Sequence, residues 1–74
     1  MKLATKGEAE KAIRQLCHQW RRTEGYTHTP EADLNFSAFY DWVARNHGSR
    51  LEFKTTSDVR YNVQMWFDQE FRRT

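Results

Sequence analysis

Apolar residues recur at helical spacing in three stretches of the chain, and the first of these is the clearest. Its members fall on one stripe at i, i+3, i+4, i+7 and i+11: Ala9, Ala12, Ile13, Leu16 and Trp20. Thr5 followed by Glu8 has the spacing of a capping box, and Gly25 suits a C-terminal stop. These signals predict a helix over about 6–23.

The second and third stretches repeat the helical pattern. The second places four apolar side chains on one face: Phe36, Phe39, Tyr40 and Val43. The third carries a stripe of its own: Val59, Val63, Trp66, Phe67 and Phe71. Asn35 or Ser37 can cap the second helix, and Gly48 is expected to end it. The predicted helices therefore run over about 36–47 and 58–72.

The segment between these two helices has a different period. Residues 49–56 alternate, with Leu51 and Phe53 apolar and their neighbours polar. A lone strand would have no partner for its backbone groups. We therefore expect an extended connector that lays Leu51 and Phe53 onto the helices, and we keep an α+β fold with a short strand near 51–55 as the alternative.

Composition supports a small aromatic core. The 74 residues include three Trp, three Tyr and five Phe, and one tryptophan falls in each predicted helix. Large rings bury much area with few rotatable bonds, which suits a short chain. The expected fold is an all-α, compact three-helix bundle that forms a single domain over 1–74.

The same composition bounds the setting of the protein. Cys17 is the single cysteine, so no intrachain disulfide can form, and the chain fits a reducing compartment. No apolar run approaches the roughly 18 residues of a membrane span, and the start of the chain lacks the apolar region of a signal peptide. We expect a soluble, cytoplasmic protein without membrane partners, of bacterial or viral type.

Residues with catalytic potential are few and badly spaced for chemistry. The histidines His18, His28 and His47 make no metal-binding motif with each other or with Cys17. There is no glycine-rich phosphate loop and no nucleophile motif. The sequence therefore predicts a non-enzymatic protein with no metal, no cofactor and no small-molecule substrate.

The third predicted helix has a second face that its apolar stripe leaves over. Tyr61 and Met65 project nearly opposite the stripe at about 100° per residue. Trp42 sits about 90° from the centre of its own stripe and is expected to flank the core in a similar way. Met adapts to a partner and Tyr contributes area at low entropic cost. We expect Trp42, Tyr61 and Met65 to form a surface for a protein partner or a homodimer, with extra core packing as the alternative.

The net charge of +2 is too balanced to identify a partner, but the first helix has a basic stripe opposite its apolar one. We call it the basic stripe, and its members are Lys11, Arg14, His18, Arg21 and Arg22. No acidic residue of the same helix lies in this arc, so the stripe could follow the phosphates of a nucleic acid. A solvated helix face is the simpler interpretation, and an acidic protein partner is a third.

A helix-turn-helix reading of the second and third helices is a weaker alternative. The third helix carries four side chains of a type that reads base edges: Arg60, Asn62, Gln64 and Gln69. The connector of about nine residues is longer than the three or four typical of that motif. The third helix also carries acidic residues that would repel phosphates: Asp58, Asp68 and Glu70.

In size and in its lack of a catalytic signature, the chain resembles small accessory proteins of phages and mobile elements as a class. The leading hypothesis is a small binding or regulatory module that docks on a protein through the aromatic and Met positions of its second and third helices. A nucleic-acid-binding module that uses the basic stripe of the first helix is the alternative.

Overall fold

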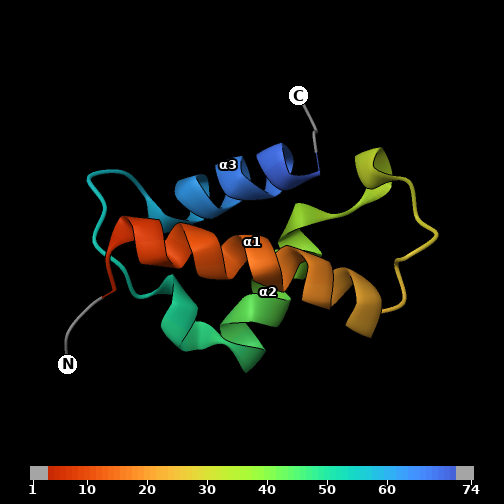
Figure 1. The fold of residues 1–74 in the computed structure, drawn as a ribbon, viewed down its shortest axis with the longest axis horizontal. Coiled ribbons are helices and arrows are strands. Elements are labelled where there is room, and N and C mark those ends of the chain that lie inside the picture. The colour runs from red at the N-terminus through yellow and green to blue at the C-terminus, as the bar shows by residue number, and fades with distance from the viewer. Residues whose placement is uncertain (1–3, 72–74) are drawn as a thin grey trace.

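A computed structural model describes residues 4–71. Its elements follow the chain in the order α1 (Lys6–Thr23), η1 (Glu31–Asp33), α2 (Phe36–Asn46), η2 (Gly48–Leu51) and α3 (Val59–Glu70). In Figure 1, α1 lies between α3 and α2, and it packs against both, more extensively against α3. No strand occurs in residues 4–71. The prediction of an all-α, compact three-helix fold is confirmed.

Both ends of α1 follow from residues within one turn of them. The Thr5 hydroxyl accepts a hydrogen bond from the Glu8 amide at 3.1 Å, and the Glu8 carboxylate accepts one from the Thr5 amide at 3.0 Å. The backbone and side-chain hydrogen bonds from Thr5 also lower the pKa of Glu8. At the other end Gly25 has a φ of 78°, and the Tyr26 amide donates to the Arg21 carbonyl at 2.8 Å. This is the Schellman geometry that favours glycine, so the predicted bounds of 6–23 are confirmed.

The other two helices begin close to their predicted positions. Asn35 caps α2 by accepting from the Ala38 amide at 3.0 Å, and α2 ends at Asn46, one residue early. Asp58 is the N-cap of α3, but its side chain makes no capping hydrogen bond. The predicted end of the third helix at 72 lies outside the described residues.

The core is built around three rings, one from each helix. The ring centroid of Trp20 lies 5.4 Å from that of Phe39 and 5.9 Å from that of Phe67, and the last two are 5.3 Å apart. All three side chains are at most 1% exposed. Edge-to-face and tilted contacts at this spacing are the favoured geometries of aromatic pairs. The large aromatic content therefore serves mainly to join the three helices.

The connector between α2 and α3 closes the core on a third side. It begins with η2 and continues in extended form to Phe53, which is buried and lies 5.5 Å from the Trp66 ring. An isolated parallel bridge joins Ala4 to Phe53. Its hydrogen bonds run from the Ala4 amide to the Glu52 carbonyl and from the Lys54 amide to the Ala4 carbonyl, both at 3.3 Å. The expected extended connector is therefore present only after Leu51, because residues 48–51 form the short 3-10 helix η2. The extended part pairs through a single bridge and not as a strand.

A buried polar side chain fixes the same connector onto α3. Asn62 is 1% exposed, and its amide nitrogen donates to the Thr55 hydroxyl at 2.9 Å and to the Asp58 carbonyl at 2.8 Å. In the described part of the chain, no buried side-chain nitrogen or oxygen lacks a hydrogen-bond partner. From inside the core, the Asn62 side chain thus holds the turn into α3 through hydrogen bonds at Thr55 and Asp58.

Candidate functional site

One side of α3 presents an exposed ring to solvent. Tyr61 is 61% exposed, the single large hydrophobic side chain so exposed in residues 4–71. Met65 follows one turn later and is half-buried against the edge of the core. Asp58 and Asp68 extend the same row, because positions 58, 61, 65 and 68 are spaced by three, four and three residues. We call these four residues the α3 outer face.

Two of the four residues of the α3 outer face are acidic, and none of the four is basic. Within residues 4–71 neither the Asp58 nor the Asp68 carboxylate forms an ion pair. The cation nearest to Asp58 in the sequence, Arg60, turns to α2, where its guanidinium lies over the rings of Phe36 and Tyr40. The arginines that follow Asp68 in the sequence lie outside the described residues. The exposed ring and the thioether are therefore flanked by two carboxylates.

Trp42 does not belong to this surface, and the expectation that it flanks the core is wrong. It is only 8% exposed, and its ring lies 6.4 Å from that of Phe39 and 5.0 Å from that of His47. The segment after α2 contributes to this burial through His47, and it continues into η2, which packs against both α2 and α1. A helical wheel gives angular positions within a single helix. It therefore does not show which side chains a connector covers.

Some members of the α1 basic stripe bind other groups of the chain, and others are open to solvent. Arg14 belongs to the first kind. Its guanidinium donates to the Glu10 carboxylate at 3.0 Å, to the Glu70 carboxylate at 3.0 Å and to the Gln69 amide oxygen at 2.6 Å. The hydrogen bond to Glu70 is the main cause of a raised Arg14 pKa. Arg14 therefore holds α1 to α3 and has little capacity left for a phosphate.

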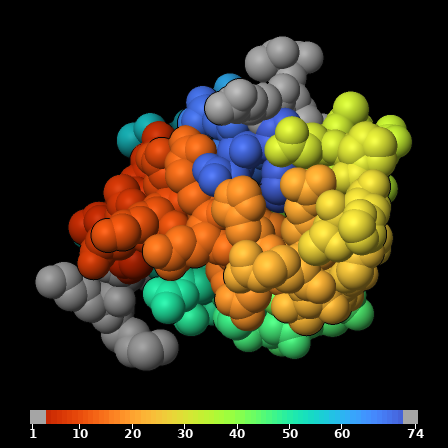
Figure 2. All heavy atoms as spheres, turned by 45° about the vertical axis from the view of Figure 1, so that its right-hand side comes forward, coloured from red at the N-terminus to blue at the C-terminus, as the bar shows by residue number. Residues whose placement is uncertain are grey.

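His18 and Arg21 are engaged as well. His18 Nε2 lies 2.6 Å from the second oxygen of Glu70. Arg21 donates to the carbonyls of Tyr26 and Thr29 at 3.1 and 2.8 Å, and it approaches the Glu31 carboxylate at 3.9 Å. In Figure 2, α3 lies above α1, and the connector that follows α1 lies beside it. These two segments supply the groups that His18 and Arg21 contact.

Two members of the stripe remain open to solvent. Lys11 and Arg22 are exposed and form no ion pair within the part of the chain that the structure describes. The acidic partners of the other members are Glu10 of α1 itself, Glu70 of α3 and Glu31 of the connector. A continuous row of five free positive groups, as the sequence suggested, is therefore not present.

Glu70 couples this cluster to pH. Burial opposes its ionisation, but the hydrogen bonds and charges of His18 and Arg14 outweigh burial and lower the pKa of the carboxyl. A lowered pKa in the folded state contributes stability above the unfolded-state value of about 4.3, and this contribution is lost as the pH falls through the folded value.

We expect Glu70→Gln to cost about 1 kcal/mol of unfolding free energy near neutral pH, because the cluster is partly exposed. The difference from the unmodified protein should shrink between about pH 5 and about pH 3. Urea unfolding at several pH values measures it. Glu52→Gln removes the same charge from an exposed carboxylate and is the control. A cost that is equal at both ends of this range would contradict the role of Glu70.

Cys17 and the possible metal ligands can be assessed within residues 4–71. Cys17 is fully buried, and burial, followed by the charge of Glu70, raises its thiol pKa to about 12. A thiol with that pKa is almost entirely protonated at neutral pH and is a poor nucleophile. No group of three or more His, Cys, Asp or Glu residues within 4–71 could hold a metal ion.

The base-reading set proposed for the third helix is also broken up. Asn62 is buried and Gln69 binds Arg14, which leaves Arg60 and Gln64 exposed on the side facing α2. Periodicity could have flagged Asn62, since it lies beside Val63 and Trp66 on the helical wheel, but its residue type suggested a surface position.

None of the helices formed within residues 4–71 has both the length and the apolar character that crossing a bilayer requires. The sequence matches no family model, no curated protein and no solved structure at a significant level.

Proposed function

We propose that this protein is a small, non-enzymatic binding module that docks on a protein partner through the α3 outer face. The partner would offer an apolar groove with lysine or arginine at its rim. Tyr61 would enter the groove, Met65 would pack at its edge, and Asp58 and Asp68 would pair with the rim. A regulatory role in the cytoplasm, in a phage or mobile element, is the setting that we predict.

The observation that carries the proposal is the exposure of Tyr61. A tyrosine ring that is 61% exposed beside a half-buried methionine has the composition of an interface anchor. Its row of residues at helical spacing is how a helix presents itself to a groove. The flanking carboxylates define the charge of the partner, since complementary charge guides both encounter and register.

The same contacts make nucleic acid the weaker candidate. Three of the five members of the α1 basic stripe already bind other groups of the chain. The α3 outer face would in turn repel phosphates. Binding through Lys11 and Arg22 alone would involve about two phosphate contacts, which gives weak affinity and a shallow dependence on salt.

Photo-crosslinking in cells of the source organism tests the docking surface. A photoreactive phenylalanine analogue at position 61 should form a specific protein adduct. The same analogue at Gln19, an exposed position on α1, should not. An adduct pattern that is identical at both positions, or nucleic acid as the main adduct at position 61, would contradict the proposal.

Binding of the purified partner then tests the roles of the individual residues. We expect Tyr61→Ala to raise Kd by about tenfold or more, as truncation of an interface anchor does. The double change of Asp58 and Asp68 to asparagine should weaken binding mainly at low salt. If Tyr61→Ala leaves Kd unchanged while the fold is intact, the ring is not an anchor.

A further inference from the structure

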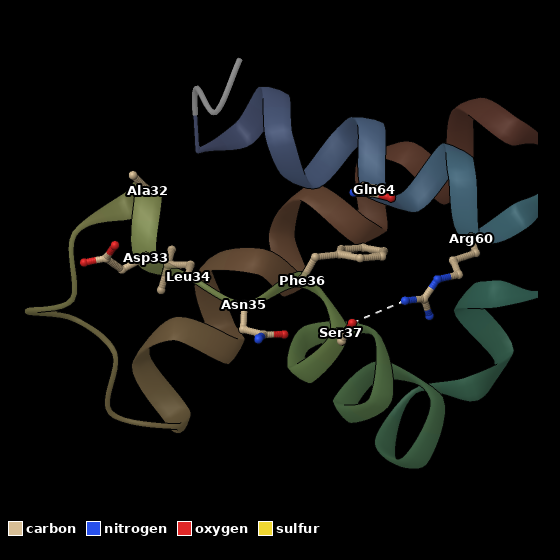
Figure 3. A pocket seen from close by; sticks show the side chains of 8 residues that line it. All are labelled: Ala32, Asp33, Leu34, Asn35, Phe36, Ser37, Arg60 and Gln64. Carbon is tan, nitrogen blue, oxygen red and sulfur yellow. Dashed lines mark hydrogen bonds between the residues drawn. The ribbon is translucent and has the colours of Figure 1, made fainter.

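Arg60 is held over two aromatic rings on the side of α3 that faces α2. Its guanidinium carbon lies 5.2 Å from the centroid of the Phe36 ring and 5.0 Å from that of the Tyr40 ring. These two rings are themselves stacked at 5.8 Å. Figure 3 shows the guanidinium directed toward Ser37, whose hydroxyl accepts a hydrogen bond at 3.3 Å. Cation–π contact with two rings restrains the guanidinium before any ligand arrives.

Most of the donors of Arg60 remain open, unlike those of Arg14 and Arg21. A guanidinium offers five N–H donors. Arg14 uses its donors on two carboxylates and an amide, and Arg21 binds two carbonyl oxygens. Within residues 4–71, Arg60 makes one hydrogen bond and no ion pair. An ordered fork with free donors matches the geometry of a carboxylate or phosphate group.

An open hollow of about 430 Å³ lies beside this arginine, between the start of α2 and α3. Residues 32–37 form one wall, and Arg60 and Gln64 form the other. In Figure 3, Arg60 stands at one end with the Phe36 ring next to it, and the Asp33 carboxylate points away at the opposite end. The acidic group of the hollow and the guanidinium thus lie at opposite ends. The open shape suits a segment of chain better than an enclosed small molecule.

We propose that Arg60, with the Ser37 hydroxyl and the Gln64 amide, binds an oxyanion carried by a peptide, either a side-chain carboxylate or a phosphate ester. Arg60 supplies the charge and the fork, and the two neutral groups supply further hydrogen bonds from the two walls. The positive end of the α2 dipole lies on the same side and adds to the favourable potential. This site goes beyond the docking of the α3 outer face and does not depend on it.

NMR titration of the full chain tests the site with small probes. The probes are the N-acetyl amides of aspartate, phosphoserine and asparagine, together with inorganic phosphate. We expect saturable shifts of the Arg60 Nε–H and Gln64 side-chain signals with aspartate or phosphoserine, and none with asparagine. The tighter of the two anionic probes identifies the oxyanion. If inorganic phosphate binds as tightly as phosphoserine, the site belongs to a free anion and the peptide part of the proposal is overturned.

Two arginine variants separate this site from general attraction to positive charge. Arg60→Lys keeps the charge but loses the fork, and it should weaken binding by about tenfold. Arg22→Lys changes an exposed arginine of α1 and should have no effect. Ser37→Ala, at an exposed position, should weaken binding without unfolding the domain. Binding that survives Arg60→Lys, or shifts of equal size at Arg22 and Arg50, would overturn the proposal.

Discussion

Replacing Trp42 by alanine should destabilise the protein by about 3–5 kcal/mol, as removal of a buried large aromatic side chain does. Trp42 is 8% exposed and packs between Phe39 and His47, so its loss leaves a cavity under η2. Small domains lie near the low end of the usual 5–15 kcal/mol of stability. Much of the variant should therefore be unfolded at 37 °C. Urea unfolding followed by circular dichroism measures the change.

Tyr61→Ala is the matched control for this prediction. It also removes a large aromatic side chain, but one that is exposed on α3, so its cost should stay below about 0.5 kcal/mol. The two variants together separate core from surface among the residues that the sequence placed in one interface. Equal unfolding free energies for the two variants would contradict both assignments.

Replacing Asn62 by alanine should cost about 2 kcal/mol. The change removes two hydrogen bonds from a side chain that is 1% exposed, and it leaves a small cavity. Because one bond reaches Thr55, the connector over residues 53–56 should also loosen. Hydrogen exchange of the backbone amides in that segment measures this second effect.

Gln64→Ala provides the comparison for Asn62. It removes an amide side chain from the same helix at an exposed position, where alanine is at least as good a helix former. We expect its stability to equal that of the unmodified protein within about 0.5 kcal/mol. If both substitutions cost the same, Asn62 has no special role in holding the connector.

The parts of the fold that the sequence predicts well depend on neighbours within one helical turn. The start of α1 needs only Thr5 and Glu8, and its end needs only Gly25 and the carbonyls just before it. Hydrophobic spacing is local in the same sense, because it relates residues three or four positions apart. These features could be predicted without knowing where any other segment lies.

The parts that could not be predicted depend on residues far away along the chain. Arg14 is paired with Glu70, which lies 56 positions later, so the positive stripe read from α1 alone was too large. Trp42 packs against His47, which begins a segment whose path no periodicity describes. Tyr61 was predicted correctly as an outward residue, and its ring is 61% exposed. The contact of the Arg60 guanidinium with two rings could be recognised only once the positions of Phe36 and Tyr40 were known.

The cluster of Trp20, Phe39 and Phe67 has a consequence for how the chain folds. Each ring comes from a different helix and touches the other two. If only two of the helices packed together, their rings would lack the contacts with the third ring. The apolar surface of those rings would then be exposed to water. Such an arrangement favours the gain or loss of all three helices in one cooperative step. For the docking proposed above, this means that a partner would meet either a complete α3 outer face or an unfolded chain, with few partly folded forms between them.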